Sequence, residues 1–317
     1  MQVDRAWRLD EGQLSAVLAL VKRAQAVDHV APLSEQVLLS ARDGRTPASA
    51  HLLAQDGTHL AGYAHLERGP TGEASTAEVV VDPADRRRGV GTALIRALED
   101  AVSPEAEALQ IWSHGHLDGA RALAARDGYS NVRELWTMRR SLRPDADPLP
   151  EVRLPEGFVA RSFVVGQDEE AWLVVNARAF ADHPEQGHIT RQDLDLRIAE
   201  PWFDATGFIL IEDTRSAAPM LAASHWTKVV PAAEPAASPT QGEVYVVGVD
   251  PAYQGLGLGR AVTVLGLAHL RERGLTQAML YVDADNTAAV ATYSRLGFTR
   301  FGADVMYSHA VHPAVPR

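Results

Sequence analysis

The sequence predicts an α/β protein with two tandem domains, each a mixed sheet with helices on both faces. The strongest observation is an internal repeat. Residues 79–91 read VVVDPADRRRGVG and residues 247–259 read VGVDPAYQGLGLG, about half the chain length apart. Each string has an apolar strand, an Asp-Pro-Ala turn and then [Arg/Gln]-x-x-Gly-x-Gly opening an apolar helix. A repeat with this spacing indicates a duplicated domain.

Length and proline content support the same division. The chain has 317 residues, enough for two domains of ordinary size. Residues 143–155 carry Pro144, Pro148, Pro150 and Pro155 among acidic residues, and proline fixes the backbone and removes hydrogen-bond donors. This pattern predicts a linker over 143–155, between an N-terminal domain (1–142) and a C-terminal domain (156–317).

The expected elements follow the repeat. The first half begins with a helix over 11–26, and the second with a strand over 157–163 and a helix over 169–180. Strands over 221–229 and 243–249 are expected to form a meander across 231–241, an exposed Pro-, Ala- and Ser-rich insertion. Each half then ends with a strand, an Ala-rich helix closed by a glycine, and a last strand. These segments are 110–113, Gly128 and 133–138 in the first half, and 278–283, Gly297 and 301–307 in the second.

Composition excludes several classes of function. The net charge is −11, whereas general nucleic-acid binding needs a basic face; Arg86, Arg87 and Arg88 are a candidate local basic pocket. There is no cysteine, hence no disulfide, thiolate nucleophile or thiolate metal site. No apolar run approaches the ~20 residues of a membrane span, and the N-terminus lacks a signal-peptide pattern. We expect a cytoplasmic protein without membrane, nucleic-acid or obligate protein partners.

The glycines of the repeated string predict an anion site. A Cβ at Gly257 or Gly259 would block the approach of an anion to the backbone. The N–H groups of the first helical turn have no partner in the helix and lie at its positive end. A tight strand-to-helix turn also needs glycine, but two copies after the same Val-x-Val-Asp-Pro string favour a pyrophosphate loop. A dinucleotide fold is not indicated, because no G-x-G-x-x-G follows a first strand.

This loop, between a strand and a helix, resembles motif A of the GCN5-related N-acetyltransferase (GNAT) family, and the resemblance covers both halves. It implies two tandem GNAT domains that use acetyl-coenzyme A (acetyl-CoA), with its pyrophosphate on the loop. The string from Asn286 through Tyr293 to Gly297-Phe298 resembles the family's second motif, in which the Asn contacts the cofactor arm and the Tyr lies near its sulfur. The implied acetyl-CoA contacts are Val79, Val80, Val81, Arg87, Arg88, Gly89, Val90, Gly91, Thr92, Val247, Gly248, Val249, Gln254, Gly255, Leu256, Gly257, Leu258, Gly259, Arg260, Asn286, Thr287, Ala288, Ala289, Val290 and Ala291.

Four further strings, at 26–36, 180–187, 225–228 and 242–251, resemble the mycothiol synthases. These tandem GNAT enzymes acetylate the cysteinyl amine of Cys-GlcN-inositol. The resemblance implies a small pseudo-disaccharide acceptor whose binding residues are Glu35, Glu185, Lys228, Glu243 and Tyr281. Because Glu35 belongs to the first half, the acceptor is expected between the domains.

Acetyl transfer from a thioester to an amine requires a neutral amine, a polarised carbonyl and a protonated leaving thiolate. We expect Glu243 to act as the base, directly or through a water, and Tyr293 to protonate the thiolate. Backbone N–H groups of 247–249 are expected to bind the thioester oxygen, with Gly248 marking a local irregularity of the strand. The structural alternatives are a solvated glutamate at a strand start and a tyrosine packed on the core.

The repeat provides an internal control. When the two Asp-Pro turns are aligned, Ser75 lies opposite Glu243. When the two helix-closing glycines are aligned, Ala124 lies opposite Tyr293 and Leu117 opposite Asn286. The N-terminal copy keeps the anion loop without the base, the acid and the Asn, so we expect it to bind acetyl-CoA and not to catalyse. This comparison holds if the alignment has no gap near Ser75, where Glu78 lies close by.

Two other functions stay open. One is an acetyltransferase of the same fold that acts on an aminoglycoside, a polyamine or a peptide amine. The other is a non-catalytic acyl-CoA sensor, against which Glu243 and Tyr293 weigh. We assign no metal, because the pairs His114/His116 and His183/His188 lack a third ligand at suitable spacing. Ser-His-Asp catalysis is not indicated, since no serine lies in a G-x-S-x-G string.

Overall fold

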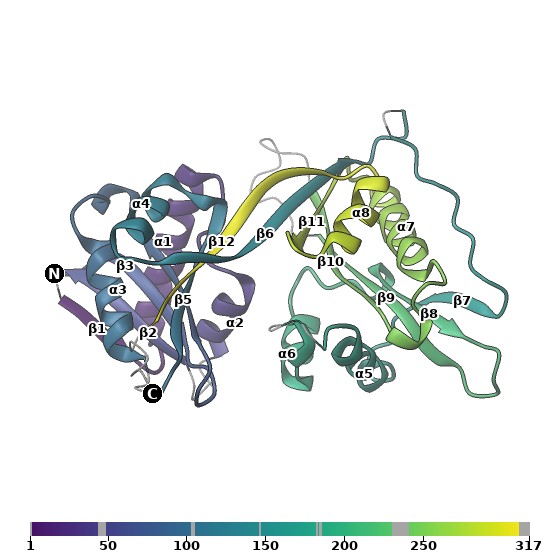
Figure 1. The fold of residues 1–317 in the computed structure, drawn as a ribbon, viewed down its shortest axis with the longest axis horizontal. Helices are drawn as coiled ribbons and strands as arrows, with labels where there is room; N and C mark the ends of the chain where they lie inside the picture. Colours follow the sequence, from purple (N-terminus) through teal and green to yellow (C-terminus); the bar gives the residue numbers. More distant parts are fainter. Residues whose placement is uncertain are drawn as a thin grey trace, which may run out of the picture. The chain divides into compact units, whose positions relative to one another are not determined.

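The computed structural model describes residues 2–43, 49–102, 105–145, 147–181, 183, 186–229 and 241–310, which form two compact units (Figure 1). Unit 1 consists of Met1–Trp136, Asp283–Asp285 and Gly302–Arg317, and unit 2 of Thr137–Val282 and Asn286–Phe301. Each unit is a mixed sheet with helices on both faces, as the sequence predicts. Among the described helices, none is long and apolar enough to cross a membrane.

Unit 1 has an antiparallel meander followed by one parallel strand pair. β1 to β4 pair antiparallel in order, β4 pairs parallel with β5, and β5 pairs antiparallel with β12. The strands are β1 (Gln2–Ala6), β2 (Ser49–Asp56), β3 (His59–Glu67), β4 (Ser75–Val81), β5 (Ala108–Ser113), the first part of β6 (Ser130–Ser141) and the last part of β12 (Thr299–Ala310). The helices are α1 (Glu11–Asp28), α2 (Glu35–Asp43), α3 (Val90–Ala101) and α4 (Asp118–Arg126).

Side chains of unit 1 alternate between the two faces of its sheet, as strand geometry requires. Leu52 of β2 packs in a core cluster with α3 and α4, whereas its neighbour Leu53 packs with α1 and α2 on the other face. α1 begins with a capping box in which Asp10 accepts from the Gln13 backbone N at 2.8 Å and the Gln13 side chain accepts from the Asp10 N at 3.0 Å. Helices therefore cover both faces of the sheet.

Unit 2 repeats this arrangement. β7 to β10 pair antiparallel in order, β10 pairs parallel with β11, and β6 is the other neighbour of β11. The strands are β7 (Phe158–Ser162), β8 (Phe208–Asp213), β9 (Met220–Lys228), β10 (Gln241–Val249) and β11 (Gln277–Asp283). The helices are α5 (Glu169–Ala179), α6 (Arg191–Ile198), α7 (Leu258–Glu272) and α8 (Thr287–Arg295).

The two faces of this sheet differ in composition. α7 packs over β8 to β10 through an aliphatic cluster that includes Ile211 and Val262. The opposite face, under α5 and α6, is aromatic: Phe208 and Trp226 stack with ring centroids 4.5 Å apart, and Trp172 meets Phe208 edge-on at 5.4 Å. Such rings bury large areas and prefer these geometries.

The sequence predicted a strand at 301–307 that lies wholly within the second domain, 156–317. In the structure, the last strand belongs only in part to unit 2. β12 pairs with β5 from Val305 opposite Ser113 to Ala310 opposite Ala108, and its residues from Gly302 onward belong to unit 1. The physical reason is the unpaired backbone on the side of β5 away from β4, which β12 satisfies. The compact units are therefore not continuous stretches of sequence.

The proline-rich segment 143–155 is packed on unit 2 instead of running free as a linker. Arg271 donates from Nε to the carbonyl oxygen of Leu142 at 2.8 Å and from Nη2 to that of Asp147 at 3.0 Å. The Asp147 carboxylate lies 2.7 Å from the buried guanidinium of Arg140. Val152 packs against the core cluster under α7. These contacts order the segment, although its prolines remove backbone donors.

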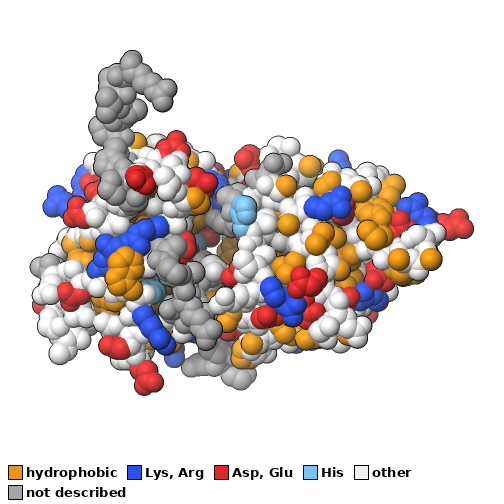
Figure 2. Space-filling view, turned by 90° about the horizontal axis from the view of Figure 1, so that it is seen from below, with side chains coloured by type: hydrophobic (Ala, Val, Ile, Leu, Met, Phe, Trp, Pro, Cys, Tyr) orange, Lys and Arg blue, Asp and Glu red, His pale blue; other side chains and the backbone are white. Residues whose placement is uncertain are grey.

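One face of the molecule carries charges of both signs. On the face shown in Figure 2, Lys and Arg side chains lie among Asp and Glu side chains and form no basic field. This agrees with the net charge of −11. The mixed charge gives no support to a nucleic-acid interface on this face.

Candidate active site

The repeated string of unit 2 folds into an uncapped helix N-terminus. The buried Asp250 accepts a hydrogen bond from the Ala252 backbone N at 2.8 Å, which fixes the Asp-Pro turn. Gly255 and Gly257 have φ of 81° and 78°, left-handed values that favour glycine. α7 begins directly after Gly257 and has no side-chain cap. Its first-turn N–H groups thus have no side-chain cap, and the binding of an anion to them stays a prediction.

The string of unit 1 has the same frame with one difference. Asp82 accepts from the Ala84 N at 3.0 Å, and Gly89 (φ 87°) precedes an uncapped α3. At the position of Gly255, however, unit 1 has Arg87 with φ 63°, a conformation that costs a residue with a Cβ roughly 1–2 kcal/mol.

The predicted basic pocket of unit 1 is largely neutralised. Arg86 forms two hydrogen bonds with the Asp28 carboxylate, at 2.7 and 2.6 Å, and Arg88 pairs with Asp85. Arg87 is exposed. Two of the three arginines therefore hold the loop in place through carboxylates and do not form a cationic surface for a ligand.

A salt bridge that was not predicted from the sequence supports each of the two Asp-Pro turns. Arg23 of α1 pairs with Asp82 at 2.7 Å, and Arg178 of α5 pairs with Asp250 at 2.9 Å. Each arginine lies near the end of the first long helix of its half. Arginines at corresponding places in the two helices are the sequence pattern that could have predicted these salt bridges.

The strand before each loop separates from its parallel neighbour. The β10–β11 pairing ends at Val244 opposite Leu280, although β10 continues to Val249 and β11 to Asp283. The β4–β5 pairing likewise ends at Glu78 opposite Trp112. Residues 247–249 stay paired with β9 along one edge. The other edge of this segment lacks its ladder partner, as the family resemblance implied. The binding of a thioester oxygen to the backbone donors there stays a prediction.

The irregularity of β10 lies at Tyr245 and not at the predicted Gly248. The register against β9 shifts between Val244 and Val246, which makes Tyr245 the extra residue of a bulge. Gly248 is in regular register opposite Ser224, and a Cβ there would lie 3.4 Å from Ala179 and Phe180. Gly248 therefore faces the end of α5 at ordinary contact distance and does not bend the strand.

The bulge changes the comparison of the two halves. Because β4 has no register shift against β3, the extra residue of β10 offsets the alignment by one position. Thr76 lies in register opposite Gln110 of β5 and Glu67 of β3. Glu243 has the matching neighbours, Met279 of β11 and Lys228 of β9. The counterpart of Glu243 is thus Thr76 and not Ser75, and Glu78 corresponds to Val246.

The helix-closing parts of the repeat align as predicted. Gly128 and Gly297 have φ of 77° and 84°, and Leu117 and Asn286 are the N-cap residues of α4 and α8. Asn286 accepts from the Ala289 N at 3.1 Å, whereas Leu117 has no capping side chain. Unit 1 therefore keeps the uncapped loop without a carboxylate at 76 or a phenol at 124.

The two candidate catalytic side chains lie on β10 and α8 of unit 2. Glu243 is half-buried on β10, between Lys228 of β9 and Met279 of β11 in register. Tyr293 is half-buried on α8, and its ring meets Phe298 edge-on with centroids 5.8 Å apart. Burial raises the pKa of Tyr293 to about 12. The phenol therefore keeps its proton at neutral pH and is available as a donor.

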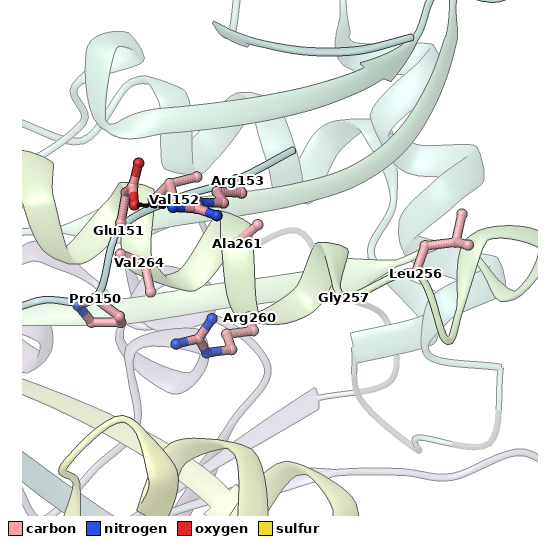
Figure 3. Close-up of a pocket in the computed structure, with 9 residues that line it drawn as sticks. All are labelled: Pro150, Glu151, Val152, Arg153, Leu256, Gly257, Arg260, Ala261 and Val264. Atoms are coloured by element: carbon pink, nitrogen blue, oxygen red, sulfur yellow. Dashed lines mark hydrogen bonds and ion pairs between the residues drawn. The ribbon is translucent and has the colours of Figure 1, made fainter. Parts of the chain in front are cut away.

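A pocket of about 350 Å³ adjoins the loop of unit 2 (Figure 3). Its walls are Pro150–Arg153 of the proline-rich segment and, from the loop and the start of α7, Leu256, Gly257 and Arg260. The last three residues are among the predicted acetyl-CoA contacts. The segment predicted as a linker thus forms one side of a cavity beside the anion loop.

Comparison with known proteins agrees with this geometry. The Acetyltransferase (GNAT) family model matches residues 19–129 and 176–298. Mycothiol acetyltransferases from Thermomonospora curvata and Geodermatophilus obscurus are 54% and 51% identical, over 94% and 96% of each chain. The chain belongs to the GNAT family and, within it, to the mycothiol acetyltransferase family.

Solved structures support the fold alone. A GCN5-related N-acetyltransferase from Sphaerobacter thermophilus is 24% identical with a TM-score of 0.65, covering 99% of this chain and 97% of its own. A tandem GNAT protein from the clavulanic acid biosynthesis pathway is 19% identical with a TM-score of 0.71, covering 99% and 100%. The tandem GNAT architecture predicted from the repeat is thereby confirmed.

The structure of this GNAT protein adds residues around Lys228. The Lys228 ammonium lies 4.7 Å from the ring centroid of Trp202 and 4.8 Å from that of Tyr245, which gives two cation–π contacts. Arg197 donates from Nε to the Tyr245 hydroxyl at 2.8 Å. The bulge at Tyr245 thus supplies a ring that holds Lys228 beside Glu243, its partner across the strands. Sequence patterns missed this group, because Trp202 is distant in sequence.

The other acceptor candidates are distributed over the chain. Glu35 is the half-buried first residue of α2 in unit 1, and Tyr281 lies on β11 of unit 2, 45% exposed. Glu185 lies outside the described residues. Their predicted roles in acceptor binding stay predictions.

Within the described part of the chain, one group has the spacing of metal ligands: His59, Asp82 and Asp85. Asp82 is already paired with Arg23, and Asp85 with Arg88 and His59. Carboxylates that are compensated by arginines gain little from a cation. His114, considered above as a possible ligand, lies between the carboxylates of Glu78 and Asp304.

Proposed function

We propose that this protein transfers the acetyl group of acetyl-CoA to the cysteinyl amine of Cys-GlcN-inositol, forming mycothiol in unit 2. The observation that carries this proposal is the identity of 54% and 51% to mycothiol acetyltransferases over nearly the whole chain. The uncapped α7, the separated β10 and β11, and the half-buried Glu243 and Tyr293 fit the acetyl transfer.

The residues of unit 2 suit the coenzyme. Two left-handed glycines and the uncapped first turn of α7 offer N–H groups to a pyrophosphate. When bound, acetyl-CoA supplies a thioester whose carbonyl carbon accepts the amine nitrogen while the carbon–sulfur bond breaks. Backbone N–H groups of 247–249 stabilise the negative charge on the carbonyl oxygen.

Glu243 takes the proton of the attacking amine, directly or through a water, and Tyr293 gives its proton to the leaving thiolate. The two transfers balance, because one proton leaves the nitrogen and one reaches the sulfur. Lys228, whose ammonium lies over the rings of Trp202 and Tyr245, is the register partner of Glu243 across the strands.

Tyr293→Phe is expected to lower kcat by about 100-fold, since general acid catalysis contributes roughly 10²–10⁴-fold. The loss should grow with acyl donors whose thiols are poorer leaving groups. The substitution keeps the ring contact with Phe298, so the melting temperature should stay within a few degrees of wild type. Equal rates for variant and wild type with a poor-leaving donor would exclude Tyr293 as the acid.

We propose further that unit 1 binds a second acetyl-CoA without catalysis, since it keeps the uncapped α3 and the left-handed Gly89. Gly89→Val and Gly257→Val are matched variants. A β-branched residue is strongly disfavoured at these values of φ, and neither position has another obstacle within 4 Å. Calorimetric titration should give two sites in wild type and one in each variant, with turnover lost only in Gly257→Val. A wild-type stoichiometry of one would refute the second site.

The experiment that tests the function is acetyl-CoA consumption with Cys-GlcN-inositol beside an aminoglycoside, a polyamine and a peptide amine, with products identified by mass spectrometry. One acetyl group on the cysteinyl amine and little turnover of the others supports the proposal. Turnover of another amine instead keeps the fold and replaces the acceptor. Tight coenzyme binding without turnover of any amine favours an acyl-CoA sensor.

A further inference from the structure

A buried carboxylate of β4 lies at the N-terminus of the helix that carries Glu35. The Glu78 Oε2 accepts a hydrogen bond from the Ser34 backbone N at 2.6 Å. Ser34 caps α2: its hydroxyl accepts from the Val37 N at 3.3 Å, and its carbonyl oxygen accepts from the Leu38 N at 3.2 Å. Glu35 follows as the first residue of α2. Glu78 therefore contacts the residue that directly precedes Glu35.

This contact replaces a local capping box. In α1 and α6, the third helical residue returns a side chain to the backbone N–H of the cap, as Gln13 does to Asp10 and Asp193 to Thr190. In α2 the corresponding residue is Val37, a buried aliphatic side chain without an acceptor. Glu78 supplies that acceptor from another element, at the end of the helix where a negative charge is favoured. The start of α2 is thus fixed by a tertiary contact.

His114 also holds Glu78, and Asp304 holds His114 in turn. The His114 Nε2 lies 3.3 Å from the Glu78 Oε2, and its Nδ1 lies 2.9 Å from Asp304, which also accepts from the Gly115 N at 2.7 Å. Burial alone would lower the pKa of His114, but hydrogen bonds and charges from both carboxylates raise it well above its usual range. Burial would likewise raise the pKa of Glu78, but His114 and the Ser34 N–H outweigh it and lower that pKa. The group is therefore an imidazolium between two carboxylates.

We propose that Glu78, held by His114 and Asp304, is a positioning residue for acceptor binding: it fixes the first turn of α2 and so the place of Glu35. The inference rests on the proposed role of Glu35 in binding the acceptor. Loss of a helix N-cap contact typically changes the helix-end equilibrium by about five- to tenfold. If Glu35 leaves its binding position to that extent, the affinity for the acceptor falls by the same factor. The rate of the chemical step does not change.

Glu78→Ala is expected to raise the KM for the acceptor about five- to tenfold, with kcat and the KM for acetyl-CoA unchanged. Glu78→Gln retains an oxygen that can accept from the Ser34 N–H and should recover most of the wild-type KM. Glu99→Ala is the matched control: Glu99 is a half-buried carboxylate of α3 that accepts from the Tyr129 hydroxyl at 2.9 Å. It should leave the acceptor KM unchanged.

A double-mutant cycle with Glu35→Gln decides whether Glu78 acts through Glu35. We expect Glu35→Gln alone to raise the acceptor KM, and Glu78→Ala to add nothing in that background. An equal rise caused by Glu78→Ala in both backgrounds would overturn the proposal, as would a folded Glu78→Ala with wild-type KM. If Glu35→Gln leaves the acceptor KM unchanged while mycothiol is still formed, the role of Glu35 fails and the positioning role with it, but the catalysed reaction stands.

His114→Gln keeps the proposal testable if Glu78→Ala does not fold. Without the imidazolium, hydrogen exchange at the first amides of α2 should become faster, while that of α1, which has its own capping box, should not change. Faster exchange together with a higher acceptor KM supports the positioning role. Unaltered exchange in α2 would overturn it.

Discussion

Glu243→Gln is expected to lower kcat/KM by about two to four orders of magnitude, the usual contribution of a general base, while the affinity for acetyl-CoA stays at its wild-type value. Glutamine has the shape of glutamate and keeps hydrogen-bonding capacity, but it cannot take a proton from the amine at neutral pH. The anion loop at Gly255 and Gly257 precedes α7, a different element from β10. The predicted coenzyme contacts on β10 are backbone groups of 247–249, so a change of the Glu243 side chain alone should leave coenzyme binding intact.

The pH profile of this variant distinguishes a base from a binding residue. An α-amino group has a pKa of about 8, so only a small fraction of the amine is neutral in mildly acidic solution. Without a base the variant depends on that fraction, and its kcat/KM should rise about tenfold per pH unit below the pKa of the amine. Wild-type turnover in Glu243→Gln from about pH 6 to about pH 9, well on both sides of that pKa, would refute the assignment.

Glu212→Gln is the matched control. Glu212 is a half-buried carboxylate of β8 in the same unit, and it pairs with Arg161 at 2.6 Å. The substitution removes the same charge from the same sheet. Turnover and its pH profile should match wild type, so that a change in Glu243→Gln reports the position and not the loss of one acidic group from unit 2.

Local features of the site were predictable because each is determined by residues close in sequence. The Asp-Pro turn and the left-handed glycines that close the two helices, Gly128 and Gly297, act within a few positions of the chain. The separation of β10 from β11 followed from the resemblance to the GNAT family. These elements repeat in both halves, and agreement between the two copies made the interpretation stronger than either string alone.

The bulge and the last strand were not predictable from local sequence. A glycine in a strand can mark a bulge, but Gly248 is in regular register and Tyr245 forms the bulge. β12 has the alternation of a strand, but its pairing with β5 depends on which sheet edge lacks a partner. A one-residue error at the bulge moved the counterpart of Glu243 from Thr76 to Ser75.

The polar cluster of Glu78, His114 and Asp304 in unit 1 was missed for a related reason. From the sequence, His114 was considered only as a possible metal ligand. Its partners Glu78 and Asp304 lie far from it in sequence, on β4 and β12. The pairing of β12 with β5 places Val305, the neighbour of Asp304, opposite Ser113, the neighbour of His114. Since that pairing was not predicted, neither was the cluster. Charge clusters that depend on tertiary pairing become visible only with the topology.

Gly266→Ala is expected to reduce the free energy of unfolding of unit 2 by about 2–3 kcal/mol, as overpacking of a core does. A Cβ at Gly266 on α7 would lie 2.1 Å from the ring of His225 on β9, far inside van der Waals contact. His225 is fully buried and donates from Nδ1 to the Val262 carbonyl oxygen at 3.0 Å. Burial lowers its pKa to about 4, so the ring is neutral and fixed by that bond. It cannot move aside without losing a buried partner.

The sign of this effect is informative, because alanine stabilises an ordinary helix interior relative to glycine by about 1 kcal/mol. Gly119→Ala in α4, where a Cβ meets nothing within 4 Å, should therefore be neutral or stabilising when unfolding is followed in denaturant. In a His225→Ala background the clash is absent, and Gly266→Ala should then cost nothing further. If Gly266→Ala lowers stability equally in both backgrounds, the ring of His225 is not the cause. If Gly266→Ala as a single substitution stabilises the protein, the packing of α7 on β9 does not depend on this glycine.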